Sequence, residues 1–251
     1  MPTSSSDDYV KRDGLAIHGI IPSGVALLDD WIAGVRDDGT HLVTGGSGAG
    51  KSTLALQFAD ASLRRRESVA MLVNTRIDDL KSHARYIGVN LDAPLRDGRL
   101  LLLRYRSDFV HRASHAVSSE QVIGDLARLV APHNPARIII DTVSPFVAGP
   151  MPVRSSALAL VEWLERLGSM ALLTLPEDVT EAYDRAIEPL VQSAAAVIRL
   201  AREDADVRRA ELVNIRYPAP PTSVRGFVIR ERLGIVAEHD VRAERLTLRA
   251  P

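Results

Sequence analysis

Short apolar runs and amphipathic stretches alternate along most of this chain. Six apolar runs predict β-strands, at residues 41–44, 69–74, 99–103, 137–141, 170–174 and 195–200. Apolar residues at helical spacing predict helices between them, at 51–64, 78–87, 120–130, 155–166 and 181–192. Strands such as Ile138-Ile139-Ile140 are apolar without interruption, which is typical of parallel strands covered by helices on both faces. The order of the elements therefore predicts a doubly wound α/β fold with a mostly parallel sheet.

The pattern changes after residue 205. Short apolar segments at 209–217, 225–230 and 234–237 are separated by proline and glycine residues. We expect them to form an antiparallel extension at the edge of the sheet and not a separate domain. The prediction is thus one domain over residues 14–240, preceded by a polar, mobile N-terminal arm at 1–13 and followed by a C-terminal tail at 241–251.

Composition narrows the class of protein. The 251 residues include 31 basic and 32 acidic side chains, so the net charge of −1 gives no electrostatic reason to expect nucleic acid or an acidic membrane as partner. The absence of cysteine excludes disulfides and cysteine chemistry. No apolar run is long enough to span a bilayer, and the N-terminus lacks the apolar core of a secretory signal. We therefore expect a cytoplasmic protein.

One glycine-rich segment carries the most specific chemistry. It reads Gly45-Gly46-Ser47-Gly48-Ala49-Gly50-Lys51-Ser52-Thr53. This matches the phosphate-binding loop G-x-x-x-x-G-K-[ST], and it stands between a predicted strand and a predicted helix, as that motif requires. Backbone N–H groups and the helix dipole would bind phosphate oxygens, Lys51 would reach the β- and γ-phosphates, and Ser52 would ligate Mg²⁺. The segment predicts a site for ATP and Mg²⁺.

A second stretch, at 137–141, has the form of a Walker B strand. Its apolar residues end in Asp141, a carboxylate that could hold Mg²⁺ beside the phosphate loop. Asp141 lies 90 residues after Lys51, which leaves room for two intervening strands and suits a RecA-like order better than a compact nucleotide kinase. The alternative is a buried strand that merely ends in an aspartate at a turn.

Four stretches share a pattern with one known family. They are the lead segment Ile21-Pro22-Ser23-Gly24-Val25 with Leu28-Asp29-Asp30, the loop and helix start from Thr44 to Phe58, the segment from Asp79 to Leu91, and the terminal segments at 209–216, 227–229 and 234–236. Together they resemble the KaiC-like branch of the RecA superfamily over residues 20–237. The resemblance implies a RecA-like fold, binding of ATP with Mg²⁺, and self-assembly into a ring or filament, with a hexamer as the expected form.

The chain departs from this family at the expected catalytic position. The family usually ends its second strand with two glutamates, one of which activates water, whereas this chain has Asn74-Thr75. Neither side chain takes a proton from water near pH 7. Other carboxylates that could replace the base are Asp78, Asp79 and Glu177. The two aspartates equally fit the start of a helix, where acidic residues are stabilising.

Two further positions bear on the family's mechanism. Thr174 and Glu177 follow the fifth predicted strand, where RecA-like proteins sense the γ-phosphate. The family also places a Lys-x-Arg on a terminal strand to reach a neighbouring subunit's nucleotide, and here that stretch reads Asn214-Ile215-Arg216. Arg216 is thus a candidate for action in trans, and its alternative role is that of an exposed strand arginine.

Two remaining features have ordinary explanations. Arg64-Arg65-Arg66 follows the phosphate-loop helix, where cations complement the helix C-terminus. His111 and His115 have the spacing of a metal-binding pair on a helix, but no third ligand is evident in the sequence.

We expect an ATP- and Mg²⁺-binding protein that acts as a nucleotide-dependent regulatory or assembly component, with a protein partner that the sequence does not name. Hydrolysis is expected to be slow or absent, so whether the chain is an enzyme stays open. The alternatives are an active ATPase motor with a displaced carboxylate and a recombinase-like DNA-binding module. The near-neutral charge and the 4% aromatic content argue against the second. A small-molecule phosphotransferase would need an acceptor pocket that the sequence does not reveal.

Overall fold

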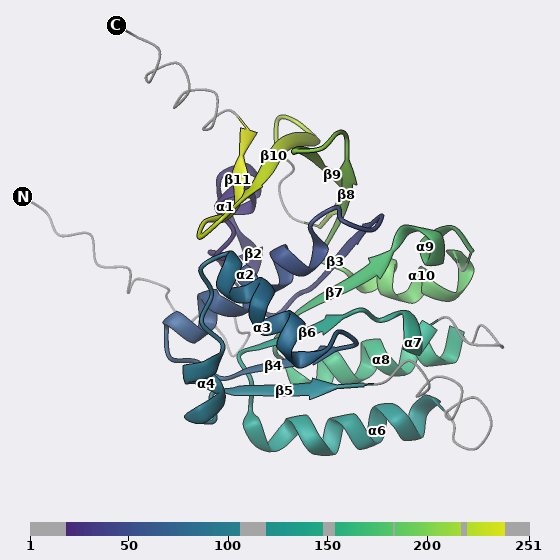
Figure 1. The fold of residues 1–251 in the computed structure, drawn as a ribbon. Helices are drawn as coiled ribbons and strands as arrows, with labels where there is room; N and C mark the ends of the chain where they lie inside the picture. The colour runs from purple at the N-terminus through teal and green to yellow at the C-terminus, as the bar shows by residue number, and fades with distance from the viewer. Residues whose placement is uncertain (1–18, 106–118, 148–153, 183, 217–219, 239–251) are drawn as a thin grey trace, which may run out of the picture.

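The computed structural model describes residues 19–105, 119–147, 154–182, 184–216 and 220–238 (Figure 1). The predicted arm at 1–13, the predicted tail at 241–251 and the histidines at 111 and 115 lie outside these residues. None of the helices in the described part of the chain is long and apolar enough to cross a membrane.

A nine-stranded sheet forms the centre of the molecule, in the order β11-β10-β9-β8-β3-β7-β6-β4-β5. The strands are β3 (Thr40–Gly45), β4 (Val69–Val73), β5 (Leu100–Arg104), β6 (Arg137–Asp141), β7 (Met170–Pro176), β8 (Ala196–Arg202), β9 (Val207–Ile215), β10 (Val224–Arg230) and β11 (Gly234–Ala237). The strands from β8 to β5 run parallel, and β9, β10 and β11 continue the sheet in antiparallel pairs. This confirms the predicted α/β fold with its antiparallel C-terminal extension.

Helices cover both faces of the parallel part (Figure 1). One face packs against α2 (Lys51–Arg64) and α3 (Ile77–Tyr86), and the other against α6 (Ser119–Val130), α8 (Arg154–Leu167) and α10 (Asp184–Ser193). The helix α1 (Ala26–Ile32) packs beside β11, in the antiparallel extension. The strand β6 shows why its apolar run is uninterrupted. Ile139 belongs to the first core, and Ile138 and Ile140 belong to the second, because successive side chains point to opposite faces.

The shorter elements connect these layers. They are β1 (Ile20–Ile21), β2 (Val35–Arg36), α4 (Asp92–Arg96), η1 (Ala131–His133), α7 (Ser144–Val147) and α9 (Glu177–Ala182). The predicted helices at 51–64, 78–87, 120–130 and 155–166 agree with the structure to within one residue at each end. The region predicted as a single helix at 181–192 covers the end of α9 and most of α10; α9 is a short helix that begins directly after β7. Its early start brings Glu177 to the end of that strand.

Arg137 joins the Walker B strand to the rest of the site. Its guanidinium is buried, donates hydrogen bonds to the carbonyl oxygens of Ser23, Phe58 and Pro22, and lies 4.2 Å from the centre of the Phe58 ring. Burial lowers the pKa of Arg137 to about 10, so the group stays charged at neutral pH. It therefore ties β6 to α2 and to the lead segment at 21–25, and so fixes the Walker B strand relative to the phosphate-loop helix.

Candidate nucleotide-binding site

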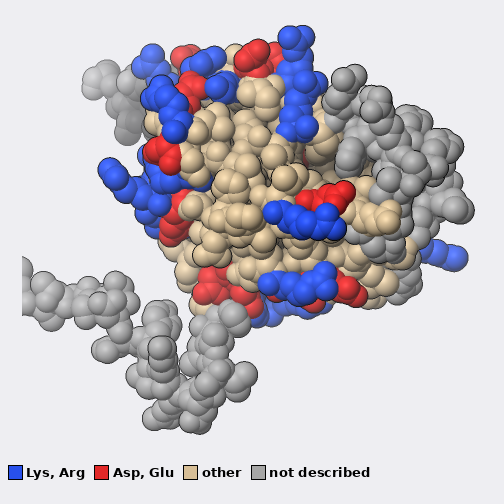
Figure 2. All heavy atoms as spheres, turned by 90° about the horizontal axis from the view of Figure 1, so that it is seen from below, with Lys and Arg blue, Asp and Glu red and all other residues tan. Residues whose placement is uncertain are grey.

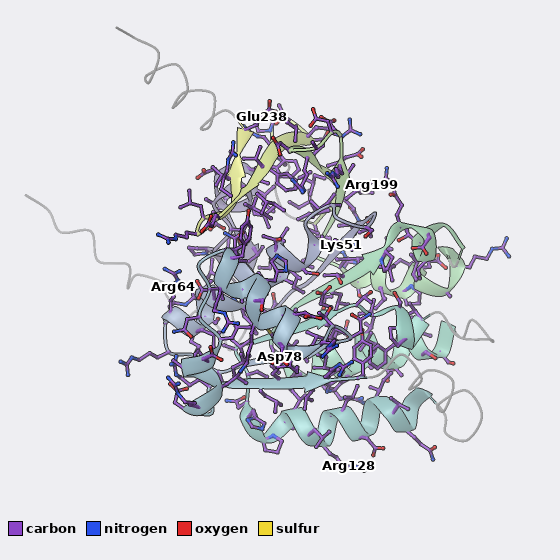
Figure 3. The ribbon with its side chains drawn as sticks, in the orientation of Figure 1. Lys51, Arg64, Asp78, Arg128, Arg199 and Glu238 are labelled. Carbon is purple, nitrogen blue, oxygen red and sulfur yellow. The ribbon has the colours of Figure 1, made fainter. Side chains whose placement is uncertain are left out.

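The carboxyl ends of four parallel strands lie next to one another and carry most of the predicted site residues. The loop at 45–53 leaves β3, Glu177 follows β7, Asp141 ends β6, and Asn74 follows β4. Ends of adjacent parallel strands meet at one edge of a sheet, which is where doubly wound folds bind ligands. Lys51 lies at this edge, where the loop enters α2 (Figure 3).

The loop has a backbone that demands glycine. Gly45, Gly48 and Gly50 have φ angles of 146°, 72° and 107°, in the region that side chains disfavour. At Gly45, a Cβ atom would also lie 2.1 Å from the carbonyl oxygen of Leu200 on β8. A backbone in these conformations can turn its N–H groups toward an anion, which is the physical requirement for binding phosphate.

The Lys51 ammonium lies over the loop. Its Nζ donates hydrogen bonds to the carbonyl oxygens of Gly45, at 2.6 Å, and Gly46, at 2.8 Å. Burial lowers the pKa of Lys51, and the carboxylates of Asp141, Asp178 and Glu177 oppose this shift. The Lys51 cation is thus held at the loop, next to where the phosphates of a bound nucleotide would lie, and close to three carboxylates.

Asp141 is buried at the end of β6, and its Oδ1 accepts a 2.5 Å hydrogen bond from Thr174 Oγ1. Thr174 is itself fully buried, so its hydroxyl orients this carboxylate. Asp141 and the Ser52 hydroxyl offer the hard oxygen ligands that Mg²⁺ prefers. No group of three or more metal-ligating acidic, histidine or cysteine side chains occurs among the described residues. This donor set fits Mg²⁺, which keeps several waters and takes further ligands from phosphates.

The position beside Asp141 lacks a carboxylate. The backbone N–H of Asn74 donates to the carbonyl oxygen of Asp141 at 3.3 Å, so Asn74 and Thr75 lie next to the Walker B strand, where the family has its glutamates. Both side chains are exposed. Asp78 and Asp79 are exposed in the first turn of α3, where they complement the helix dipole.

Glu177 differs from the other candidate carboxylates. It begins α9, and β7 pairs with β3 up to the loop itself, with Pro176 opposite Gly45. Its Oε2 lies 3.7 Å from the position that a Cβ atom would take on Gly46. Of the three carboxylates that could replace the missing base, Glu177 is therefore the one that lies against the phosphate loop.

Two arginines that no sequence motif indicated lie beside the loop. Arg208 Nε donates to the carbonyl oxygen of Gly48 at 3.1 Å, and Arg202 Nη1 lies 3.7 Å from the position of a Cβ atom on Gly48. Arg202 and Arg208 are paired across β8 and β9. Because they reach the loop through an antiparallel hairpin late in the chain, no local pattern could have identified them.

The structure also places α3 and β10 at the loop. His83 and Tyr86 on α3, and Ile229 on β10, line a cavity of about 420 Å³ together with loop residues 47–53. His83 Nε2 lies 3.0 Å from Thr53 Oγ1, and burial lowers the pKa of His83, which favours its neutral form. These three residues lie in stretches that carry the family resemblance, but only the packing of α3 and β10 around the loop identifies them as lining residues.

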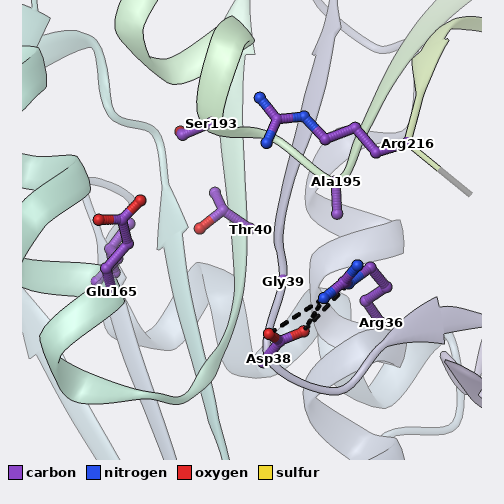
Figure 4. Close-up of a pocket in the computed structure, with 9 residues that line it drawn as sticks. Arg36, Asp38, Gly39, Thr40, Glu165, Ser193, Ala195 and Arg216 are labelled. Atoms are coloured by element: carbon purple, nitrogen blue, oxygen red, sulfur yellow. Dashed lines mark hydrogen bonds and ion pairs between the residues drawn. The ribbon is translucent and has the colours of Figure 1, made fainter. Parts of the chain in front are cut away.

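Arg216 lies beside the amino ends of the parallel strands, whereas the phosphate loop lies at their carboxyl ends. Its backbone N–H donates to the carbonyl oxygen of Ala195, just before the start of β8, whereas the phosphate loop follows the end of β3, which runs parallel to β8. Its guanidinium faces a second cavity, of about 210 Å³, which also contains the Arg36–Asp38 ion pair and Glu165 (Figure 4). The length of β3 separates Arg216 from its own chain's phosphate loop, so it cannot act there in cis.

The basic run lies at the end of α2, where cations complement the helix C-terminus, as expected from the sequence: Arg64 is the last residue of the helix and Arg65 is its C-cap. Arg64 pairs with Asp60, and Arg65 pairs with Glu67. On the face shown in Figure 2, basic and acidic side chains lie interspersed, with no single basic patch.

Similarity to known proteins identifies the family of the chain. No curated protein matches it significantly. The crystal structure of the KaiC-like protein PH0186 from the hyperthermophilic archaeon Pyrococcus horikoshii OT3 has the same fold, with a TM-score of 0.71 and 21% sequence identity over 88% of this chain and 99% of that one. The family described as KaiC ATPase matches residues 21–240. The chain therefore belongs to the KaiC-like ATPase family, a branch of the nucleotide-binding RecA superfamily.

Proposed function

We propose that this protein binds ATP with Mg²⁺ at the loop 45–53 and acts as a nucleotide-dependent regulatory or assembly component that hydrolyses ATP slowly or not at all. The observation that carries the proposal is the arrangement at the sheet edge. A complete phosphate loop and the oriented Asp141 stand together, while Asn74 lies next to Asp141 at the position where the resemblance implies a catalytic carboxylate.

The residues have separable tasks. The Lys51 ammonium would exchange its two carbonyl partners for β- and γ-phosphate oxygens, which are better partners because they are charged. Asp141 and Ser52 would hold Mg²⁺, with Thr174 keeping the Asp141 carboxylate in position. Bound Mg²⁺ would neutralise charge on the phosphates. These contacts bind and orient the nucleotide, and they do not include a group at Asn74 or Thr75 that takes a proton from water.

Calorimetry with ATP and Mg²⁺ tests binding directly. Lys51→Ala should weaken binding by roughly 2–4 kcal/mol, because it leaves the phosphate charge without its cation. Arg128→Ala is the control, since Arg128 is exposed on α6 and pairs only with Asp125 among the described residues. Equal ATP affinity in the wild type and in Lys51→Ala would refute the proposed site.

A second candidate function is an active ATPase, and the position of Glu177 favours it. Its carboxylate is the one placed against Gly46 and Lys51, where a γ-phosphate would lie. A base there would replace the missing glutamate from a different strand. The recombinase-like alternative has less support, because the net charge is near neutral and the one face drawn in Figure 2 shows mixed charge.

Assembly into a ring or filament is part of the proposal. A head-to-tail contact brings one edge of a subunit against the opposite edge of the next. The phosphate loop and Arg216 lie at opposite ends of the parallel strands, which suits such a contact. Arg216 would then supply a cation to the neighbouring subunit's nucleotide, with a hexamer as the expected closed form. A cytoplasmic location stays a prediction from the composition.

A further inference from the structure

A histidine from α3 is hydrogen-bonded to the phosphate loop. His83 Nε2 lies 3.0 Å from Oγ1 of Thr53, the last residue of the loop segment 45–53 and the third residue of α2. Both residues line the cavity beside the loop. Thr53 is 2% exposed, and within the described part of the chain its hydroxyl has no other hydrogen-bond partner. The contact therefore joins α3 to the first turn of the phosphate-loop helix.

The first turn of α2 is the place where an anion would be held. The leading N–H groups of a helix have no partner within the helix, and they bind phosphate together with the helix dipole. Two hydroxyls belong to this turn, those of Ser52 and Thr53. The Ser52 oxygen is assigned to Mg²⁺, which leaves the Thr53 hydroxyl as the one that can donate to a phosphate oxygen.

The Thr53 hydroxyl has a single proton and can donate one hydrogen bond. When Nε2 of His83 carries no proton, the hydroxyl donates to Nε2 and has no proton left for a phosphate. When Nε2 is protonated, its N–H donates to Oγ1 instead, and the hydroxyl proton is free to turn toward another acceptor. The same two atoms are hydrogen-bonded in both states, but the direction of the bond is reversed.

The charges around His83 decide which state prevails. Burial lowers the pKa of His83 below its ordinary value of 6.5, and the Asp141 carboxylate on β6 opposes this shift. The Lys51 ammonium on α2 lines the same cavity, whereas β10 adds no charged or titratable side chain to the described lining. On α3 itself, Asp79 and Tyr86 lie one turn away on either side. Phosphates bound at the loop are negatively charged, so they would act in the same direction as Asp141 and raise the pKa of His83.

We propose that His83 is a proton-linked positioning residue: on nucleotide binding, Nε2 takes up one proton from solvent, and the Thr53 hydroxyl is thereby freed to donate to a phosphate oxygen. Before binding, the neutral ring has its proton on Nδ1. The inference rests on the proposed function, because it takes the phosphates to lie on the loop 45–53. It goes further in making nucleotide affinity rise as the pH falls, since a ligand that favours protonation is itself favoured by protons.

Calorimetry with ATP and Mg²⁺ at pH 8 and at pH 5.5, above and below the ordinary titration of histidine, tests this link. The wild type is compared with His83→Gln, which keeps a polar side chain but does not titrate. Comparison at the same pH cancels the titration of ATP itself. Between pH 8 and pH 5.5 the ratio of affinities should shift in favour of the wild type by roughly 5- to 150-fold, the usual range for coupling between two ligands. Wild-type binding should also take up more protons than binding by His83→Gln, seen as an enthalpy that depends on the ionisation enthalpy of the buffer.

Substitutions of Thr53 show whether the histidine acts through this hydroxyl. Thr53→Val removes the hydroxyl at nearly constant volume and should abolish the gain in affinity at low pH, although His83 can still titrate. Thr53→Ala repeats the test without a branched side chain, and Thr53→Ser, which keeps the hydroxyl, should retain the gain. His133→Gln is the matched control, because His133 is exposed on η1, and it should show the pH dependence of the wild type.

Two results would overturn the inference. An equal pH dependence of ATP affinity in the wild type and in His83→Gln would remove the proton link. A gain at low pH that persists in both Thr53→Val and Thr53→Ala would show that the histidine charge acts on the phosphates directly, without the hydroxyl. In both cases, ATP binding that depends on Lys51 would keep the proposed function. If the wild type bound no ATP at either pH, the proposed function would fail together with the inference.

Discussion

Thr174 Oγ1 donates a 2.5 Å hydrogen bond to Oδ1 of Asp141, and both residues are buried on the neighbouring strands β7 and β6. From its place in the sequence, Thr174 is also a candidate sensor of the γ-phosphate. Its hydroxyl is instead used to hold the Walker B carboxylate. The residue that turns toward the loop after β7 is Glu177. Neighbouring residues of one strand end thus divide two tasks, orientation of Asp141 and contact with the loop.

Thr174→Val removes this hydrogen bond at nearly constant volume. We expect a loss of about 1–3 kcal/mol in the free energy of unfolding, because a buried acceptor loses its donor. A higher Mg²⁺ concentration should also be needed to support ATP binding, since the carboxylate is no longer held in one orientation. Denaturant unfolding and a Mg²⁺ titration at fixed ATP measure the two effects. Thr174→Ser, which keeps the hydroxyl, should restore the Mg²⁺ dependence; a Mg²⁺ dependence that stays unchanged in Thr174→Val would exclude the orienting role.

Asn74→Glu restores a carboxylate beside Asp141. A positioned base contributes about 10²–10⁴-fold to rate, so turnover should rise substantially if the rest of the site is intact. Phosphate release under single-turnover conditions measures this change. Asn74→Gln, which matches the length of glutamate without its charge, should leave the slow rate unchanged. A fast wild-type rate would show that the base has been assigned to the wrong strand end.

Glu177→Gln separates the slow-hydrolysis proposal from the active-ATPase alternative. If Glu177 is the base, turnover should fall by about 10²-fold or more without any loss of ATP affinity. If hydrolysis is slow for lack of any base, the rate should not change. ATP affinity should rise slightly in either case, because a negative charge next to the phosphates is removed. Asp78→Asn serves as the control, because Asp78 is exposed on α3.

Arg216→Ala tests the role of this arginine in trans. We expect ATP with Mg²⁺ to stabilise the wild-type assembly and to stabilise that of the variant less, because the guanidinium fork matches phosphate oxygens and stays charged at any working pH. Light scattering with and without nucleotide measures the difference. Arg128→Ala should behave as the wild type. A monomer under every condition would remove the ring, and an unchanged assembly in Arg216→Ala would leave Arg216 as a solvated strand arginine.

Because His41 is buried, we expect the stability of the protein to depend on pH. Burial lowers its pKa from 6.5 to about 4, and the nearby Arg137 cation acts in the same direction. Below pH 6.5 the unfolded chain binds a proton that the folded chain refuses, so stability should fall as the pH drops toward 4. The loss between pH 7 and pH 5 is about 2 kcal/mol from this residue. His41→Phe should flatten the slope in denaturant unfolding, whereas substitution of the exposed His133 by Gln should not.

Much of this protein is determined by local pattern. The uninterrupted apolar runs predicted strands that helices cover on both faces, and the glycine-rich loop between a strand and a helix predicted a phosphate site. The carboxylate after Ile138-Ile139-Ile140 predicted a Mg²⁺ ligand beside that loop. Each is a consequence of side-chain spacing or backbone freedom over a few residues. The absence of a glutamate at 74 and 75 was also visible without any coordinates.

The tertiary structure alone decided which distant residues share the site. Asp78, Asp79 and Glu177 look alike in sequence, and only the pairing of β7 with β3 brings Glu177 against the loop. The cavity wall combines Tyr86 from α3 with Ile229 from β10, and Arg216 is carried to the far edge by the antiparallel return of β9. These relations depend on strand order and register across more than 100 residues. Local propensity does not encode them, because it acts only over the span of a helix turn or a strand.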